Sequence, residues 1–188
     1  MRIPQETQTA MKMTADNTPG QVNIPDVCTG VCFTGHRDMT SDDIAAADHR
    51  LDRLLRDLIE KNGARRFFAG GAIGMDTLCA LKVLALREEY PHIALDLLIP
   101  CIGYEKYMSD EEKKIYYETV GRADRVMHFG DHYYRGCPLV RDRALVDNAD
   151  LCIAWLNPDL PDGGTAYTVK YARKKQVPVI NIFRQENS

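Results

Sequence analysis

The chain has 188 residues, of which 45% are hydrophobic and 27% charged, enough apolar material for one ordinary core and too little for two. Its formal net charge of −3 argues against tight, salt-dependent binding of nucleic acid, so any phosphate site has to be local and DNA is a disfavoured partner. No segment has the apolar length of a signal peptide or a membrane span, and we expect a cytoplasmic protein without a membrane partner.

Residues 1–26 are rich in Thr, Gln, Asn and Pro without periodicity, which predicts a disordered N-terminal arm followed by a single domain over residues 27–188. The six cysteines include no C-x-x-C pair and no Cys/His cluster at zinc spacing, and the five histidines are scattered. We therefore expect reduced core cysteines and no metal site. No cofactor is expected, with a Mg²⁺ ion beside a bound phosphate as the alternative.

Short apolar segments alternate with amphipathic ones along the rest of the chain. Strands are predicted, in chain order, at residues 28–33, 66–69, 93–99, 125–129, 151–156 and 178–183. Helices are predicted from about residue 41 to Asn62 and at residues 75–89, 110–120, 139–148 and 165–174. Buried strands joined by helices are typical of a parallel sheet covered on both faces. The sequence thus predicts an α/β, Rossmann-like, doubly wound fold with a mainly parallel sheet of about six strands.

Ligands of such sheets bind beyond the carboxyl ends of the strands, and the unusual residues of this chain gather at those ends. The residues expected to bind a ligand are Thr34, Gly35, His36 and Arg37 after the first strand, Gly70, Gly71, Ala72, Gly74, Met75 and Asp76 after the second, Pro100 and Tyr104 after the third, Tyr133 after the fourth, Arg141 on the next helix, and Gly163, Gly164 and Thr165 after the fifth.

The glycine turn at residues 70–76 leads from a strand into a helix, where backbone N–H groups and the helix dipole favour a phosphate. It is neither a P-loop nor the G-x-G-x-x-G dinucleotide fingerprint. A tight turn without a ligand is the alternative. A second glycine pair at residues 163–165 also begins a helix, and Thr165 could both cap that helix and bind an anion. Two such turns at one edge favour ligand binding.

Charged and titratable side chains complete the expected site. Arg37 suits bidentate binding of a phosphate, or is a solvated loop arginine. Arg141 and Arg143 are two residues apart on a helix, so at most one faces the site, and we favour Arg141. His36 is either an acid or base near neutral pH or a loop histidine bonded to the backbone.

Aromatic rings and one carboxylate leave further alternatives open. Tyr104, Tyr133 and Tyr134 could stack on a base or simply cover the sheet edge. Asp76 falls in the first turn of its helix, where it either caps the helix or accepts from a ribose hydroxyl or positions a water. Asp76 is the one candidate catalytic residue.

The chain resembles the YpsA-like branch of the SLOG superfamily. The resemblance rests on T-G-H-R at residues 34–37, G-G-A-I-G-M-D at residues 70–76, the Tyr/Arg stretch, and G-G-T at residues 163–165, in this order. That superfamily also contains the DprA (Smf) DNA-processing proteins and the LOG-type phosphoribohydrolases. The resemblance covers nearly all of residues 27–183 and implies a Rossmann-like fold with a nucleotide site.

The sequence departs from the LOG-type motif P-G-G-x-G-T-x-x-E, whose glutamate takes part in cleaving the N-glycosidic bond. The matching stretch at residues 161–168 is one residue shorter, lacks one glycine and has Thr168 in the place of the glutamate. The Arg-Asn pair of that family is Arg141-Asp142 here. Since a hydroxyl cannot replace a carboxylate in this chemistry, the resemblance does not carry hydrolase activity over.

Three functions follow, in order of preference. The first is a sensor or binding module for a nucleotide or nucleotide-derived phosphate. The second is a nucleoside 5′-monophosphate N-glycosidase that uses Asp76 in place of the glutamate. The third is single-stranded DNA binding, which needs clustered arginines that the net charge does not favour. A homo-oligomer is compatible with all three.

Overall fold

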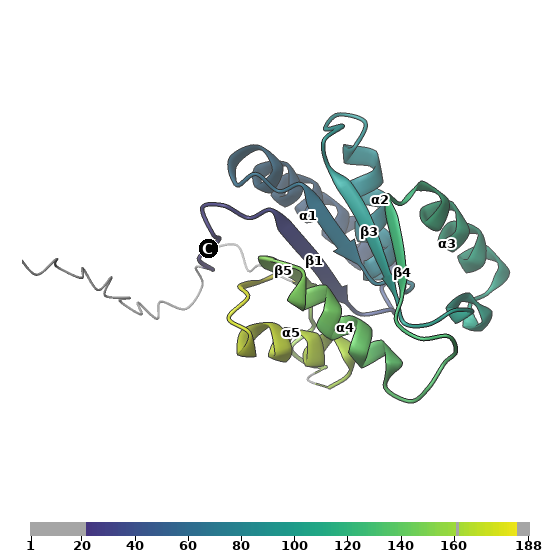
Figure 1. Ribbon diagram of the computed structural model, residues 1–188. Helices are drawn as coiled ribbons and strands as arrows, with labels where there is room; N and C mark the ends of the chain where they lie inside the picture. The colour runs from purple at the N-terminus through teal and green to yellow at the C-terminus, as the bar shows by residue number, and fades with distance from the viewer. Residues whose placement is uncertain (1–21, 161, 184–188) are drawn as a thin grey trace, which may run out of the picture.

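The computed structural model describes residues 22–160 and 162–183 (Figure 1). Residues 1–21, most of the predicted disordered arm, lie outside the described residues, as do residue 161 and residues 184–188 at the end of the predicted domain. Where the described chain begins, the Asn62 amide donates a hydrogen bond of 2.9 Å to the Pro25 carbonyl, and Ile24 packs on the core. Of the helices in the described part, none combines the length and apolar character that a membrane span requires.

Strands and helices alternate along the described chain. The strands are β1 (Gly30–Gly35), β2 (Arg66–Ala69), β3 (Ala94–Ile99), β4 (Arg125–His128), β5 (Leu151–Trp155) and β6 (Val179–Asn181). The helices are α1 (Ser41–Lys61), α2 (Met75–Leu86), α3 (Asp110–Arg122), α4 (Cys137–Asp147) and α5 (Gly164–Lys174), with a short 3₁₀ helix at Tyr104–Tyr107. The 3₁₀ helix was not predicted from the sequence, and β6 is shorter than its apolar segment.

The strands form one parallel sheet in the order β4-β3-β2-β1-β5-β6. The strand order reverses between β1 and β5, because β1 to β4 follow one another toward one edge of the sheet whereas β5 and β6 lie on the other side of β1. Cys32 of β1 lies opposite Cys152 of β5. Helices α1, α2 and α3 lie on one face, and α4 and α5 on the other (Figure 1). The predicted doubly wound, Rossmann-like α/β fold is confirmed, and the reversal leaves a crevice at the carboxyl ends of β1 and β5.

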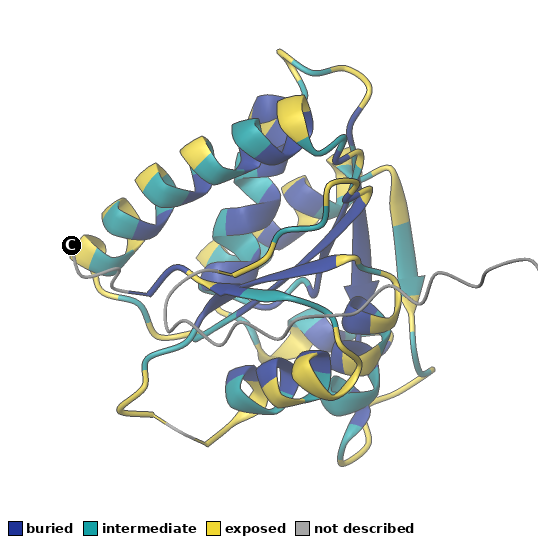
Figure 2. Ribbon diagram, turned by 90° about the vertical axis from the view of Figure 1, so that its left-hand side faces the viewer, coloured by how far each residue is buried: buried dark blue, intermediate teal, exposed yellow. Residues whose placement is uncertain are grey.

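Burial explains which residues build these elements. The central strands β1 and β5 are buried along nearly their whole length, as strands covered on both faces must be, and the inner faces of the helices are buried with them (Figure 2). Helix α1 turns Leu51, Leu55 and Leu58 inward at helical spacing. Its outer face and the loops stay exposed, so the core lies between the sheet and the helices on each side (Figure 2).

Asp150 fixes the start of β1 against β5. Its Oδ2 accepts hydrogen bonds from the backbone N–H groups of Thr29 and Gly30, both at 2.9 Å, and from the Thr29 hydroxyl at 3.0 Å. The backbone N–H of Asp150 in turn donates to the Gly30 carbonyl at 2.8 Å. The strand pair that frames the crevice is therefore anchored at its opposite end.

We predict that Asp150→Ala lowers the free energy of unfolding by about 1–2 kcal/mol, because three hydrogen bonds to a carboxylate are lost at an exposed position. Urea unfolding followed by circular dichroism measures the change. Asp131→Ala, an exposed aspartate in the loop after β4, is the control and should change stability by less than about 0.5 kcal/mol. Equal losses for both variants would contradict an anchoring role.

Candidate functional site

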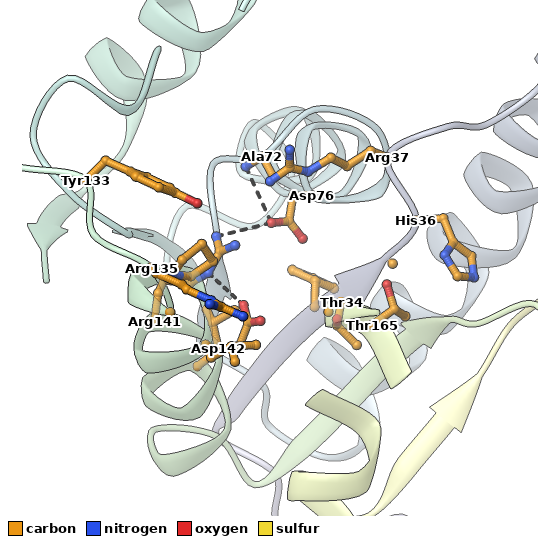
Figure 3. Close-up of a pocket in the computed structure, with 17 residues that line it drawn as sticks. Thr34, His36, Arg37, Ala72, Asp76, Tyr133, Arg135, Arg141, Asp142 and Thr165 are labelled. Carbon is orange, nitrogen blue, oxygen red and sulfur yellow. Dashed lines mark hydrogen bonds and ion pairs between the residues drawn. The ribbon is translucent and has the colours of Figure 1, made fainter. Parts of the chain in front are cut away.

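A cavity of about 730 Å³ lies at the carboxyl edge of the sheet, where β1 and β5 diverge. We call it the main cavity (Figure 3). The main cavity is lined by Phe33, Thr34 and Gly35 at the end of β1, by His36 and Arg37 after β1, by Ala72 before α2 and Asp76 in it, by Tyr133, Arg135 and Gly136 before α4, by Pro138, Leu139, Arg141, Asp142 and Leu145 of α4, and by Gly164 and Thr165 of α5. Both helix layers thus contribute to one cavity.

The structure brings many of the predicted residues together at this cavity. Those that line it are Thr34, Gly35, His36, Arg37, Ala72, Asp76, Tyr133, Arg141, Gly164 and Thr165. The predicted residues outside its lining are Gly70, Gly71, Gly74, Met75, Pro100, Tyr104 and Gly163. Tyr104 lines an adjoining cavity, and Gly74 borders a separate groove between α1, α2 and α3. Their roles in ligand binding stay predictions.

Three charged side chains form a buried ion triad in the cavity wall: Asp76, Arg141 and Asp142 (Figure 3). Arg141 is only 5% exposed and comes from α4, whereas Asp76 lies in the first turn of α2 on the other face of the sheet. The Arg141 Nε donates to Asp142 Oδ1 at 2.8 Å, and its Nη1 lies 3.5 Å from Asp76 Oδ2. The same Nη1 donates to the Gly70 carbonyl. The triad therefore joins the two helix layers above the sheet edge.

Burial sets the protonation of the two aspartates. Loss of solvent raises the pKa of Asp76 to about 6, against the opposing effect of Arg141 and with a further increase from Asp142. A hydrogen bond from the Ala72 N–H, at 3.4 Å, lowers this pKa only in part. Burial also raises the pKa of Asp142, although Arg141 opposes the increase. One arginine thus does not fully offset the burial of two carboxylates.

The raised pKa of Asp76 makes stability depend on pH. The unfolded carboxyl loses its proton near pH 4 and the folded one near pH 6, so the free energy of unfolding falls as pH rises through this window. We predict that Asp76→Asn, which cannot ionise, gains about 2 kcal/mol on the wild type between pH 4 and pH 6.5. Urea unfolding of both proteins across this pH range measures the difference. The charged groups that face position 76, namely Arg37, Arg141 and Asp142, are the same in both proteins. Parallel pH profiles would contradict the prediction.

The glycines of the turn at residues 70–76 make room for other parts of the protein. A Cβ atom on Gly70 would collide with the Arg141 guanidinium and with Asp76. Gly74 has φ of +79°, and a Cβ there would collide with the backbone carbonyl of Arg37. The Met75 N–H donates to the His36 carbonyl at 3.2 Å. Close packing of this turn on α4 and on the loop after β1 accounts for both glycines.

His36 makes a backbone hydrogen bond at the far side of the cavity from Tyr133 and Arg135 (Figure 3). Its Nε2 accepts from the Asn157 N–H at 3.0 Å, and burial lowers the pKa of the imidazole. The ring is therefore neutral at neutral pH. This contact matches the backbone-bonded alternative, and it ties the loop after β1 to the loop after β5.

The N-termini of α4 and α5 at the cavity differ from those of α1 and α3. Helices α1 and α3 each begin with a capping box, in which the N-cap residue is Thr40 and Ser109, respectively. Helices α4 and α5 instead have the N-caps Gly136 and Gly163, both with positive φ, and among the described residues no side chain caps either helix. In α4 the first-turn N–H groups of Cys137 and Leu139 donate to the carbonyls of Tyr134 and Gly136, and Pro138 has none. Of these two helices, α5 is therefore the one that offers first-turn N–H groups to the cavity.

Sequence reasoning missed part of the lining. The missed residues are Phe33, Arg135, Gly136, Pro138, Leu139, Asp142 and Leu145. The prediction started the fourth helix at residue 139, whereas α4 starts at Cys137 with Pro138 in its first turn. Glycine followed closely by proline is a helix-start signal that would have placed this N-terminus at the cavity. Leu139 and Leu145 carry only the common apolar pattern of a helix.

Thr168 does not line the main cavity. It is fully buried in α5, and its hydroxyl donates to the Gly164 carbonyl at 2.8 Å. Within residues 22–160 and 162–183, no three side chains among His, Cys, Asp and Glu are arranged to hold a metal ion. The titratable groups at the cavity are the ion triad, Arg37, Arg135, His36 and Tyr133.

Known structures resemble this fold. The structure reported for the single-stranded DNA binding mode of DNA processing protein A from Helicobacter pylori superposes with a TM-score of 0.58 at 22% identity, and the match covers 87% of this chain and 69% of that chain. A structural genomics target, TM1055, superposes with a TM-score of 0.51 at 16% identity over 80% of this chain and 72% of that chain. At these identities the likeness concerns the fold alone.

Curated sequences are similar over shorter stretches. The UPF0398 protein BH1768 of Halalkalibacterium halodurans is 29% identical over 121 residues, and the match spans 63% of each chain. The prophage-derived protein YoqJ of Bacillus subtilis, described as uncharacterized, is 29% identical over 79 residues, 42% of this chain and 46% of its own. The matched part is thus less than two thirds of these relatives. A family model named YpsA and described as "YspA SLOG family" matches residues 32–183. The chain therefore belongs to the YpsA family of SLOG proteins.

Proposed function

We propose that this protein binds a nucleotide or nucleotide-derived phosphate in the main cavity and acts as a sensor or binding module. The observation that carries the proposal is the meeting of the N-terminus of α5, which no described side chain caps, with arginine side chains at one cavity. Backbone N–H groups at a helix N-terminus and guanidinium groups are both good partners of phosphate oxygens.

The charge of the cavity favours an anion. Arg37, Arg135 and Arg141 face Asp76 and Asp142, which leaves one positive charge in excess when both carboxylates are ionised. The pKa of Asp76, about 6, lets an incoming anion shift this carboxyl toward its neutral form and so raise the excess. A local positive site of this kind is compatible with the overall negative charge of the chain.

The loop and turn residues supply neutral partners for the same ligand. Thr165 lies in the first turn of α5, and its hydroxyl can bind an anion beside the backbone N–H groups. Thr34, at the end of β1, lines the cavity from the opposite layer. A volume of about 730 Å³ is within the range of small-molecule and cofactor sites.

Gly164→Ala tests the anion site without disturbing the fold. Gly164 has an ordinary helical backbone, and a Cβ there would lie 3.7 Å from Asp142 Oδ2, at normal contact distance. The added methyl group occupies the cavity wall beside the α5 N–H groups. We predict at least tenfold weaker binding of a nucleoside 5′-phosphate at unchanged melting temperature. A thermal-shift screen against nucleoside 5′-mono-, di- and triphosphates measures the melting temperature of each variant. Calorimetric titration with the same compounds then measures the binding affinity.

Gly121→Ala is the matched control, because Gly121 lies on α3 away from the cavity and an added Cβ meets no described atom within 4 Å. It should bind like the wild type. Binding that is equal in Gly164→Ala and the wild type, or no binding of any phosphate in the panel, would refute the proposal.

An oligonucleotide belongs in the panel because of the structural likeness to DNA processing protein A. Salt-sensitive binding of the oligonucleotide alone would favour the DNA-binding alternative.

A second candidate function is a nucleoside 5′-monophosphate N-glycosidase. The observation that favours it is the position of Asp76, a buried carboxyl in the cavity wall with a pKa of about 6. A carboxyl with a pKa near neutrality can donate a proton to a leaving base. Against it, Thr168 stands in the place of the LOG-type glutamate and lies outside the cavity lining. Binding without turnover is therefore the preferred function.

Release of free base separates the two functions. Under the binding proposal, incubation with nucleoside 5′-monophosphates yields no free base above the level of a protein-free blank, measured by liquid chromatography. Under the glycosidase alternative, base accumulates, and Asp76→Asn lowers its rate at least a hundredfold while binding is retained. Base release that depends on Asp76 would show that the protein is an enzyme and would overturn the binding proposal.

A further inference from the structure

A smaller cavity of about 300 Å³ adjoins the main cavity and shares Arg37, Tyr133 and Pro138 with it. We call it the tyrosine cavity. Its other lining residues are Ile73, Tyr104, Tyr107 and Met108. The 3₁₀ helix after β3 provides Tyr104 and Tyr107, while Tyr133 comes from the loop that leads into α4. The tyrosine cavity is thus framed by two loops at the same edge of the sheet as the phosphate site.

The lining of the tyrosine cavity consists mainly of rings and apolar groups. Tyr107 is 75% exposed and Tyr133 is 50% exposed, although both are large side chains with apolar faces. Their rings meet edge to face, with centroids 5.7 Å apart and planes at 62°. Ile73 and Met108 add apolar surface. Exposed aromatic rings at the rim of a concave apolar surface suit a flat ring that can stack against them.

A polar contact marks the boundary between the two cavities. The Arg37 Nη2 donates to the Tyr104 hydroxyl at 2.7 Å, and Tyr104 is buried, with its pKa raised by that burial. Arg37 lines both cavities. The guanidinium is therefore held where a ligand would pass from the charged cavity into the aromatic one.

We propose that the tyrosine cavity binds the heteroaromatic base of a nucleoside 5′-phosphate whose phosphate lies in the main cavity. This inference rests on the proposed function and extends it, because it adds the base to the phosphate as a recognised group. The main cavity is charged and suits the phosphate, whereas the adjoining cavity is aromatic and suits the base. Because stacking on tyrosine tolerates different bases, we expect the site to distinguish ligands with a base from ligands without one, and to discriminate little among the bases.

Ribose 5-phosphate and a nucleoside 5′-monophosphate differ only by the base, and their comparison tests the inference. For the wild type we expect calorimetric titration to give at least tenfold tighter binding of the monophosphate. Tyr107→Ala, at a residue that lines the tyrosine cavity but not the main cavity, should weaken monophosphate binding about tenfold and leave ribose 5-phosphate binding within twofold. Tyr133→Ala should also weaken monophosphate binding about tenfold. Tyr107→Phe retains the ring and should keep the affinity of the wild type.

Tyr134→Ala is the matched control, because Tyr134 follows Tyr133 in the same loop and is 42% exposed but lines neither cavity. It should bind both compounds like the wild type. Equal affinity of the wild type for the two compounds, or equal loss in the Tyr133 and Tyr134 variants, would overturn the base site while the phosphate site stands. If neither compound binds, the proposed function fails and the inference fails with it.

Discussion

A buried arginine holds together the edge of the sheet where the main cavity lies. Arg141 reaches from α4 on one face to Asp76 at the start of α2 on the other, and it also binds Asp142 and the Gly70 carbonyl. A buried charge without its partners is strongly destabilising, so these groups have to come together when the protein folds. The constraint explains the glycine at position 70, where any side chain would displace the guanidinium.

The position of Arg141 also gives the glycine turn at residues 70–76 a structural role. From the sequence, the turn was the leading candidate for a phosphate cradle. In the structure, Gly70 and Gly74 fit against Arg141 and against the backbone of Arg37, and Asp76 accepts from the Ala72 N–H. On the other side of the cavity, α5 begins at the N-cap Gly163 with no capping side chain among the described residues. The proposed anion site accordingly centres on the N-terminus of α5 and the neighbouring arginines, with Asp76 as a neighbour whose charge responds to the ligand.

The fold and the edge that carries the site were predictable, because both follow from local patterns. Continuous apolar strands alternating with helices imply a doubly wound sheet, and Thr34, Arg37 and Thr165 all follow strands, so they had to meet at one edge. Contacts between distant segments were not predictable. Nothing near Arg141 in the sequence indicates that it binds Asp76 across the sheet, and the 3₁₀ helix that carries Tyr107 has no periodic signal. Tyr104 and Tyr133 were predicted from the sequence as possible stacking residues, but the contact of Tyr133 with Tyr107 emerged only from the structure.

The exposed rim of the tyrosine cavity is built from residues that the core does not need, although Tyr104 behind it is buried in the core. Tyr107 and Tyr133 are largely exposed and stand on a short 3₁₀ helix and a loop, whereas the ion triad and the strands are buried. Substitutions of Tyr107 and Tyr133 have small effects on stability, and they change the surface next to the charged cavity. Substitution of Tyr107 and Tyr133 therefore offers a way to change which molecule is recognised. The buried contacts of Arg141 that hold the sheet edge together are not affected by such substitutions.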